Sequence, residues 1–225
     1  PDGELTHFVA IVSDRTAIRQ AEQELHYLAQ YDGLTSLPNR LLATDRLNRA
    51  IERSEPVGAR VACLFLDIDD FKNINDTLGH AAGDQVLLIA STRIKAVTER
   101  ADTIARLGGD EFMIIRENIQ NATAAANLAM KIINELQRPF YIIGHELTLS
   151  ASIGISLYPD NALSPQDLIR LADTAMYAAK DRGRRTYAFY QSEMTETATR
   201  YMTRSLELRR GLENNELVLY YQPQM

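Results

Sequence analysis

The sequence contains the stretch Ile104-Ala105-Arg106-Leu107-Gly108-Gly109-Asp110-Glu111-Phe112-Met113-Ile114-Ile115, in which two strand-like runs flank two glycines and two acids. Two strands joined by a Gly-Gly link predict a tight β-hairpin, because a type I′ turn requires positive φ angles. Glycines leave the turn bare, so a ligand can approach the backbone there. Asp110 and Glu111 then open the second strand. By themselves these two acids fit a solvated hairpin tip equally well.

The composition is that of a globular protein of 225 residues, 45% of them hydrophobic and 24% charged. This length allows one ordinary domain with flanking pieces. A net charge of −6 argues against a general nucleic-acid binder or a protein that binds anionic membranes. It does not exclude a nucleotide ligand, because a metal ion can supply positive charge. We therefore expect no contact of this chain with nucleic acid or membrane.

Cysteine usage and hydropathy indicate an intracellular setting. The single cysteine, Cys63, lies in the apolar run Val61–Leu66, which predicts a buried thiol and no disulfide. No apolar run reaches transmembrane length and no signal-peptide pattern opens the chain, so we expect a cytoplasmic location. The chain begins at Pro1, without Met, as a fragment would. A longer parent protein with a membrane anchor elsewhere is compatible with this sequence.

Hydrophobic periodicity predicts an α/β protein. Amphipathic helices are expected around 41–51, 87–97, 125–136 and 168–179, the second preceded by a polar, glycine-punctuated segment, 73–84. Strands are expected at 61–66, in the central hairpin, in a second hairpin around Gly144-His145, and at 150–157 and 186–190. This order predicts an α+β sandwich in which helices cover both faces of a mixed, mostly antiparallel sheet.

Two acids mark the expected functional edge of the sheet. Asp67 ends the buried strand, and Asp110 follows the glycines. If the two strands are neighbours, both carboxylates meet at one edge, where they repel unless a cation joins them. Oxygen ligands suit Mg²⁺ or Mn²⁺, and Mg²⁺ commonly combines one or two carboxylates with substrate phosphates. The pattern therefore predicts a nucleoside triphosphate site.

Further polar residues fit such a substrate. Lys72, Lys180 and Arg184 could contact phosphate oxygens, although basic residues at a helix C-terminus also compensate the helix dipole. Asn75 and Asp84 could read a base edge, since a carboxylate accepts from the two adjacent N–H groups that guanine offers and adenine does not. The sequence lacks a P-loop motif, which excludes that class of nucleotide-binding proteins.

Five stretches, in the right order between Asp32 and Tyr190, resemble the GGDEF family of diguanylate cyclases. They are Asp32–Arg40, Asp67–Asp76, Gly79-His80-x-x-Gly83-Asp84, Gly108–Phe112 and Ala179-Lys180-x-x-Gly183-Arg184. The resemblance implies a fold like that of nucleotide cyclase and polymerase palms. It also implies metal-dependent condensation of two GTP molecules into cyclic di-GMP and pyrophosphate by a homodimer.

The resemblance assigns roles to residues by position. Asp67, the Ile68 carbonyl and Asp110 hold Mg²⁺ (or Mn²⁺), and Glu111 belongs to the metal-binding and catalytic groups. Catalysis involves Asp110, Glu111 and Lys72, and the substrate contacts are Phe71, Lys72, Asn75, His80, Asp84, Gly109, Lys180 and Arg184. The family's inhibitory Arg-x-x-Asp site is degenerate here, because Glu99 replaces the Arg before Asp102. The neighbouring Arg100 could substitute only if the backbone lets it reach.

The termini resemble neighbouring domains of such proteins. Residues 1–14 resemble the last strand of a PAS-like domain, and 15–31 a linker helix or a short coiled coil. The GGDEF domain covers 32–190, and 191–225 resemble a linker helix and the first strand of a truncated EAL domain, without phosphodiesterase activity in this fragment. Two alternatives to an active cyclase remain: a GTP-binding module that regulates an adjacent EAL phosphodiesterase, and a dimerisation scaffold without a ligand.

Overall fold

The computed structural model describes residues 24–194 except residue 26. The expected PAS-like strand within 1–14, the first half of the linker helix and nearly all of the segment 191–225 lie outside the described residues.

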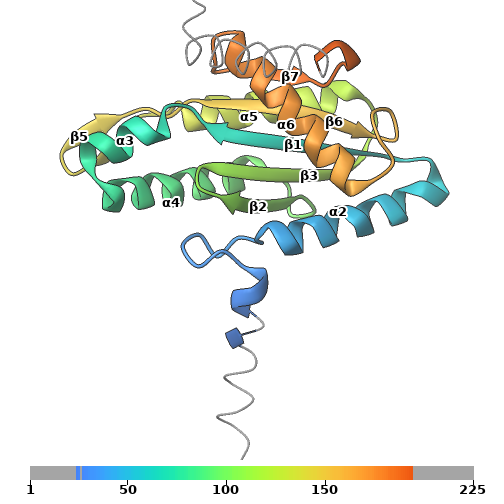
Figure 1. The fold of residues 1–225 in the computed structure, drawn as a ribbon, viewed down its shortest axis with the longest axis horizontal. Coiled ribbons are helices and arrows are strands. Elements are labelled where there is room, and N and C mark those ends of the chain that lie inside the picture. The colour runs from blue at the N-terminus through green and yellow to red at the C-terminus, as the bar shows by residue number, and fades with distance from the viewer. Residues whose placement is uncertain (1–23, 26, 195–225) are drawn as a thin grey trace, which may run out of the picture.

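One five-stranded sheet forms the centre of the described domain (Figure 1). Its strand order is β2-β3-β1-β6-β7, and all neighbours are antiparallel except β6 and β7. The strands are β1 (Arg60–Ile68), β2 (Thr103–Gly108), β3 (Glu111–Ile119), β6 (Ala151–Tyr158) and β7 (Tyr187–Phe189). A separate hairpin contains β4 (Phe140–Ile142) and β5 (His145–Leu147). The mixed, mostly antiparallel sheet is confirmed, and the second hairpin turns one residue earlier than expected.

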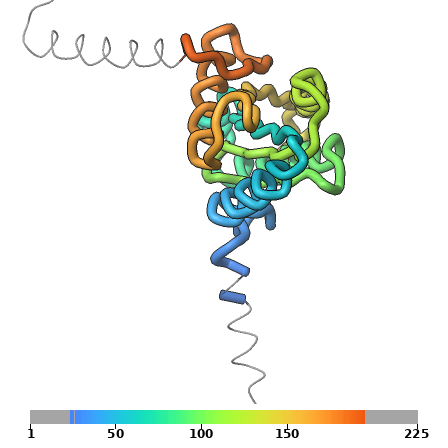
Figure 2. The backbone as a smooth tube through the Cα atoms, turned by 90° about the vertical axis from the view of Figure 1, so that its right-hand side faces the viewer, coloured from blue at the N-terminus to red at the C-terminus, as the bar shows by residue number. Residues whose placement is uncertain are grey.

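Helices cover both faces of this sheet. The core on one face packs α2 (Arg40–Ser54) and α6 (Pro165–Asp181) on alternate residues of β1, among them Cys63 and Phe65. The other face of β1 packs against α4 (His80–Val97) and α5 (Ala122–Leu136). Figure 2 places the orange α6 and the yellow-green α5 on opposite flanks. Burial on both faces explains why the sequence of β1 is continuously apolar.

Local signals explain the helix ends. The side chains of Asn39, Asn121 and Ser164 accept hydrogen bonds from the first turns of α2, α5 and α6. Asn39 is therefore the N-cap residue of α2, which begins at Arg40. A short helix, α3 (Phe71–Leu78), occupies the polar segment before α4, and Gly79 with a φ of 83° separates the two helices. Phe71, Ile74 and Leu78 lie on one face of α3 and pack on the core, but the sequence analysis missed the helix because it is short and polar at its other positions.

Gly154 in β6 lets α6 lie unusually close to the sheet. A Cβ atom at this position would stand 1.9 Å from the carbonyl oxygen of Ala172 and 2.2 Å from the backbone nitrogen of Met176. The two contacted atoms belong to the α6 backbone, which cannot yield as a side-chain end can. The glycine therefore fixes the distance between β6 and the helix that carries Lys180.

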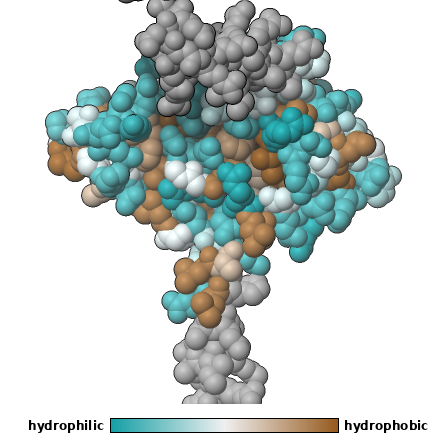
Figure 3. Space-filling model, viewed as in Figure 1, coloured by the Kyte–Doolittle hydropathy of each residue, from teal (hydrophilic) through white to brown (hydrophobic). Residues whose placement is uncertain are grey.

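Cys63 lies in the core of the domain, and polar side chains cover much of the surface seen in Figure 3. Cys63 is fully buried, as predicted, and burial raises the pKa of its thiol to about 12. The face shown in Figure 3 is mostly hydrophilic, with separated apolar patches. Among the described residues, none of the helices combines the length and apolarity needed to cross a membrane.

Candidate nucleotide and metal site

The signature hairpin turns on Gly109 and Asp110, not on the two glycines. Gly108 already pairs with Glu111 across β2 and β3, with a register shift just before it. Of the two turn residues only Gly109 has a positive φ, 54°, so the expected type I′ turn is wrong. Gly108 instead bends the strand with a φ of 141°. Asp110 consequently lies at the tip of the turn, while Glu111 begins β3.

The structure brings Asp67, Asp110 and Glu111 together, as the sequence predicts. β1 and β3 are neighbours, and Asp67 stands opposite Glu111 in their register. The backbone N–H of Ile68 donates a hydrogen bond to the carbonyl oxygen of Asp110 over 3.3 Å. Three acids and the buried backbone of Ile68 therefore occupy one end of two adjacent strands.

Two cations and a further acid complete this edge. The Lys180 ammonium from α6 lies 2.7 Å from Oδ1 of Asp67, whose side chain is only 12% exposed. Arg40 at the start of α2 pairs with Oε2 of Glu111 over 3.2 Å. Asp173 lies on α6 seven residues before Lys180, hence on the same side of the helix. Negative charge still exceeds positive charge in this cluster.

Burial and mutual repulsion raise the pKa of three of these acids. For Asp67, burial raises the pKa, Lys180 opposes the shift, and Asp110 adds to it. Burial also raises the pKa of Glu111, which Arg40 counteracts and Asp173 increases. The pKa of Asp173 is raised by burial and lowered in part by Lys180 and Arg40. A site in which the pKa values of Asp67, Glu111 and Asp173 are raised binds added positive charge favourably.

The residues fit a divalent cation whose coordination shell is completed by the substrate. Asp67, Asp110 and Glu111 offer the hard oxygen donors that Mg²⁺ prefers. Within the described residues, however, no group of three or more acidic, His or Cys side chains is arranged to hold a metal ion alone. One or two carboxylates with phosphate oxygens and water is the usual arrangement for Mg²⁺ with nucleotides. The donor set therefore fits Mg²⁺ or Mn²⁺ arriving with a triphosphate.

Asp69 has a structural role that the sequence analysis did not anticipate. Its buried carboxylate accepts hydrogen bonds from the hydroxyls of Ser150 (2.8 Å) and Ser152 (2.7 Å) and from the backbone N–H of Arg185 (3.3 Å). It joins the end of β1 to β6 and to the segment that follows α6. Asp69 therefore contributes to the fold and not only to the charge near the site.

The predicted base-reading residues lie on α3 and α4. A Cβ atom added to Gly83 would stand 1.9 Å from Oδ1 of Asn75 and 3.3 Å from the ring of the buried Phe71. The Asn75 amide therefore lies directly over Gly83, and the exposed Asp84 follows in the chain. This arrangement brings Phe71, Asn75 and Asp84 to the junction of the two helices.

Other predicted contacts remain open to solvent. Lys72 is exposed on the first turn of α3, three residues before Asn75 and hence on the same side of the helix. His80 is exposed at the start of α4, and Arg184 is exposed beyond α6 with a φ of 62°. In the described part of the chain, none of these three side chains forms a hydrogen bond or an ion pair. They are available to a ligand, although the structure does not bring them into contact with the acids.

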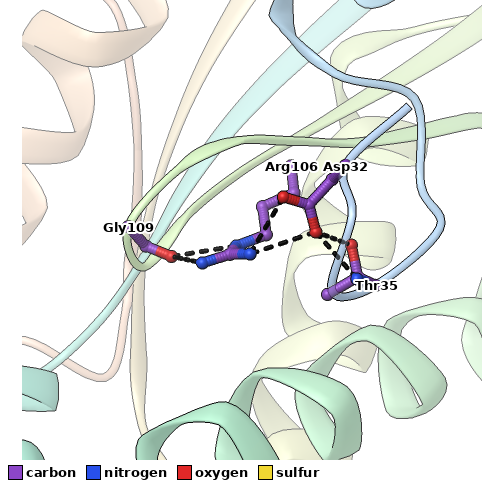
Figure 4. Close-up of polar contacts among 4 residues, drawn as sticks. All are labelled: Asp32, Thr35, Arg106 and Gly109. Carbon is purple, nitrogen blue, oxygen red and sulfur yellow. Dashed lines mark hydrogen bonds and ion pairs between the residues drawn. The ribbon is translucent and has the colours of Figure 1, made fainter. Parts of the chain in front are cut away.

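Arg106 links the signature turn to the start of the domain (Figure 4). Its guanidinium donates to the Gly109 carbonyl from Nε (3.0 Å) and Nη2 (2.8 Å), and Nη1 lies 3.0 Å from both carboxylate oxygens of Asp32. Asp32 also accepts from the backbone N–H and hydroxyl of Thr35, and these contacts lower its pKa against the effect of burial. The pair is largely buried, with Arg106 12% and Asp32 19% exposed. This network holds the backbone of the residue preceding Asp110.

The predicted inhibitory position lies between α4 and β2. Arg116 of β3 binds the nearly buried carboxylate of Asp102 through two nitrogens and lies 3.3 Å from Oε1 of Glu99. The backbone N–H of Glu99 donates to Asp102 over 2.7 Å. An open pocket of about 440 Å³ adjoins them, lined partly by Asn118, Asn121 and Asn127 and other polar side chains. Both carboxylate oxygens of Asp102 thus already accept hydrogen bonds from other residues of the same chain.

The sequence analysis missed Arg106, Asp69, Arg40 and Asp173 as parts of the site. Asp173 could have been found, because its spacing from Lys180 places both residues on one helical face. Arg40 and Asp32 were noted only as members of a motif. Arg106 carried no signal of its own, since its partner lies 74 positions away in the sequence.

The fold and the acidic sheet edge define a nucleotidyltransferase-type α/β domain. A family model described as diguanylate cyclase, GGDEF domain, matches residues 29–186, and the chain belongs to this family. The chain spans about a third or less of the curated relatives it matches.

Among these relatives is the bifunctional diguanylate cyclase/cyclic di-GMP phosphodiesterase MucR of Pseudomonas aeruginosa, 45% identical over 93% of this chain and 30% of its own length. Another is the cyclic di-GMP phosphodiesterase PdeR of Escherichia coli, 38% identical over 95% of this chain and 32% of its own length. The solved GGDEF domain of TpbB (YfiN) from Pseudomonas aeruginosa is 39% identical, with a TM-score of 0.73, over 75% of this chain and 99% of that one.

Proposed function

We propose that this domain is an active diguanylate cyclase that condenses two GTP molecules into cyclic di-GMP and pyrophosphate. The observation that supports this most directly is the meeting of Asp67, Asp110 and Glu111 at one end of β1 and β3, beside the bare backbone of Gly109. Family membership supports the reaction class. The polar junction of α3 and α4 supplies a place for the base.

The chain's own residues perform the binding and orienting steps. A divalent ion held by Asp67, the Ile68 carbonyl and Asp110 would lower the pKa of the ribose 3′-hydroxyl and neutralise phosphate charge. Asp110 accepts the hydroxyl proton, and Glu111 maintains negative charge beside it. Lys72, Lys180 and Arg184 hold the triphosphate so that the α-phosphorus faces the attacking oxygen in line.

The reaction needs two domains, because each domain binds one GTP. The helical residues that precede Asp32 support such pairing, since Leu25 is 67% and Leu28 56% exposed. These two leucines are three residues apart, as successive apolar positions of a coiled coil are, and a second copy of the helix would cover them. We therefore propose a homodimer, at least during turnover, with PAS-like and EAL domains flanking the cyclase in the parent chain.

Incubation with GTP and Mg²⁺, followed by chromatography of the products, tests this proposal. Cyclic di-GMP and pyrophosphate should form, and the rate per molecule should rise with protein concentration until the dimer is saturated. Binding of GTP without any product would instead favour a module that regulates an adjacent phosphodiesterase. That second function is supported by the relative named a phosphodiesterase, PdeR.

The base-reading residues should give guanine selectivity. We expect GTP to bind at least about tenfold more tightly than ATP at equal Mg²⁺, because adenine would leave the polar groups of Asn75 and Asp84 unpaired. Gly83→Ala should remove most of this preference, since the new Cβ displaces the Asn75 amide. Calorimetry with both nucleotides measures the effect. Gly33→Ala is the matched control, because a Cβ there meets nothing within 4 Å, and equal affinities in the wild type would refute the base-reading role.

The degenerate inhibitory position should not bind cyclic di-GMP tightly. Glu99 repels an anionic product, and Arg116 already occupies Asp102. We expect a dissociation constant above roughly 100 μM, tightened by Glu99→Arg and tightened most when Arg116→Met also frees Asp102. Calorimetric titration measures these affinities. Tight wild-type binding that Arg100→Ala abolishes would show that the neighbouring arginine replaces the missing one.

A further inference from the structure

Lys180 pairs with the carboxylate that the proposed function assigns to metal binding. The ammonium lies 2.7 Å from Oδ1 of Asp67, and the two side chains are only 24% and 12% exposed. Both charges are therefore partly removed from water, which strengthens their attraction relative to an exposed pair. In this state Asp67 already has a cation.

We propose that Lys180 holds Asp67 until a triphosphate draws the ammonium away, so that a divalent cation binds together with the nucleotide and not before it. The inference rests on the proposed function and adds an order of binding to it. Lys180 then acts first as a stand-in for the metal charge and afterwards as a phosphate contact.

Electrostatic competition supports this order. A divalent ion on the free oxygen of Asp67 would lie within a few ångströms of the Lys180 ammonium, and the two like charges would repel. The surrounding charged groups do not remove the conflict: Asp110, Asp173 and Glu111 attract both cations, while Arg40 repels both. A metal ion arriving alone must therefore displace Lys180.

The ligand count supports the same order. No three acidic, His or Cys side chains of the described residues form a metal site by themselves. A metal ion that binds without a nucleotide would break the ion pair between Lys180 and Asp67 and would gain only a few protein ligands in return. A triphosphate makes metal binding more favourable in two ways. Its oxygens complete the coordination shell of the metal ion, and they give the Lys180 ammonium a new partner. The Lys180 ammonium also lies 5.6 Å from the ring centroid of the exposed Tyr177, one turn earlier on α6, in a cation–π contact.

Titration of Mn²⁺ without nucleotide, followed by electron paramagnetic resonance of the free ion, tests the proposal. We expect Lys180→Met to bind Mn²⁺ at least about tenfold more tightly than the wild type, because the competing charge is gone. Lys180→Arg keeps a cation and should bind as weakly as the wild type. Lys131→Met is the matched control, since Lys131 is exposed on α5 and pairs with no acid of the described chain.

A second titration, with a non-hydrolysable GTP analogue present, measures the coupling. The analogue should increase Mn²⁺ affinity strongly in the wild type and much less in Lys180→Met. Mn²⁺ alone should also raise the melting temperature of Lys180→Met and leave that of the wild type nearly unchanged. If Lys180→Met melts below the assay temperature, Lys180→Gln provides the same comparison.

Equal Mn²⁺ affinity of the wild type and Lys180→Met would overturn the proposal, as would tight Mn²⁺ binding by the wild type without nucleotide. These failures differ from failure of the proposed function. A protein that converts GTP but shows no effect of Lys180 on Mn²⁺ refutes only the order of binding. A protein that forms no product but shows the Mn²⁺ differences refutes only the cyclase activity.

Discussion

Asp110→Asn is expected to reduce the conversion of GTP at least about 100-fold while the domain stays folded. The substitution removes a charged oxygen ligand and the proposed proton acceptor but keeps the shape of the side chain. The fold uses Asp110 through its backbone carbonyl, which the Asn variant retains. Asp67→Asn should have a similar effect on conversion. Product formation at saturating GTP and Mg²⁺, together with the melting temperature, measures both consequences.

Asp160→Asn is the matched control for these variants. Asp160 pairs with Arg60 at the other end of β1 over 3.0 Å, and both side chains are more than 40% exposed. Loss of such an exposed pair has little effect on stability, and turnover should match the wild type. Wild-type turnover of Asp110→Asn or Asp67→Asn would remove the basis of the proposed metal site.

Arg106→Ala should combine a loss of stability with a loss of turnover. The side chain makes four hydrogen-bond contacts, two to Gly109 and two to Asp32, and its removal leaves Asp32 without a charge partner in a mostly buried position. We expect a decrease of roughly 3 kcal/mol in the free energy of unfolding, which corresponds to about 6–12 °C in melting temperature. Turnover at a temperature where the variant is folded should fall about tenfold or more, because the turn that carries Asp110 loses its support.

Two comparisons separate these effects. Arg53→Ala removes an exposed pair with Glu117 and should change stability by less than about 0.5 kcal/mol. Arg106→Lys keeps the positive charge and loses the planar fork, so it should recover part of the stability and little of the turnover. If Arg106→Ala turns over GTP at the wild-type rate while folded, the network supports the fold without positioning Asp110.

Much of the fold could be predicted because its signals are local. The apolar run of β1, the alternating hairpin and the helical periodicities each lie within one short segment, and all appear in the structure. The errors also have local causes. α3 is short and mostly polar, and the register shift before Gly108 moved the signature turn by one residue.

The candidate site was predictable where residue type alone implies chemistry. Acids at the ends of neighbouring strands predicted the cluster of Asp67, Asp110 and Glu111. The partners of these acids were not predictable in the same way, because they depend on pairings across the sheet. The contact of Lys180 with Asp67 was not expected, and Asp69 proved to be a buried acceptor for two serine hydroxyls.

The double role of Asn39 has a mechanical consequence. Its side-chain amide donates to the Ala29 carbonyl (2.9 Å) and its backbone N–H to the Gln30 carbonyl (2.8 Å), while its Oδ1 caps α2. One residue thus closes the end of the incoming helix and opens the first helix of the domain. Because one residue bonds to both elements, the end of the incoming helix and the start of α2 are held in a fixed relation to each other.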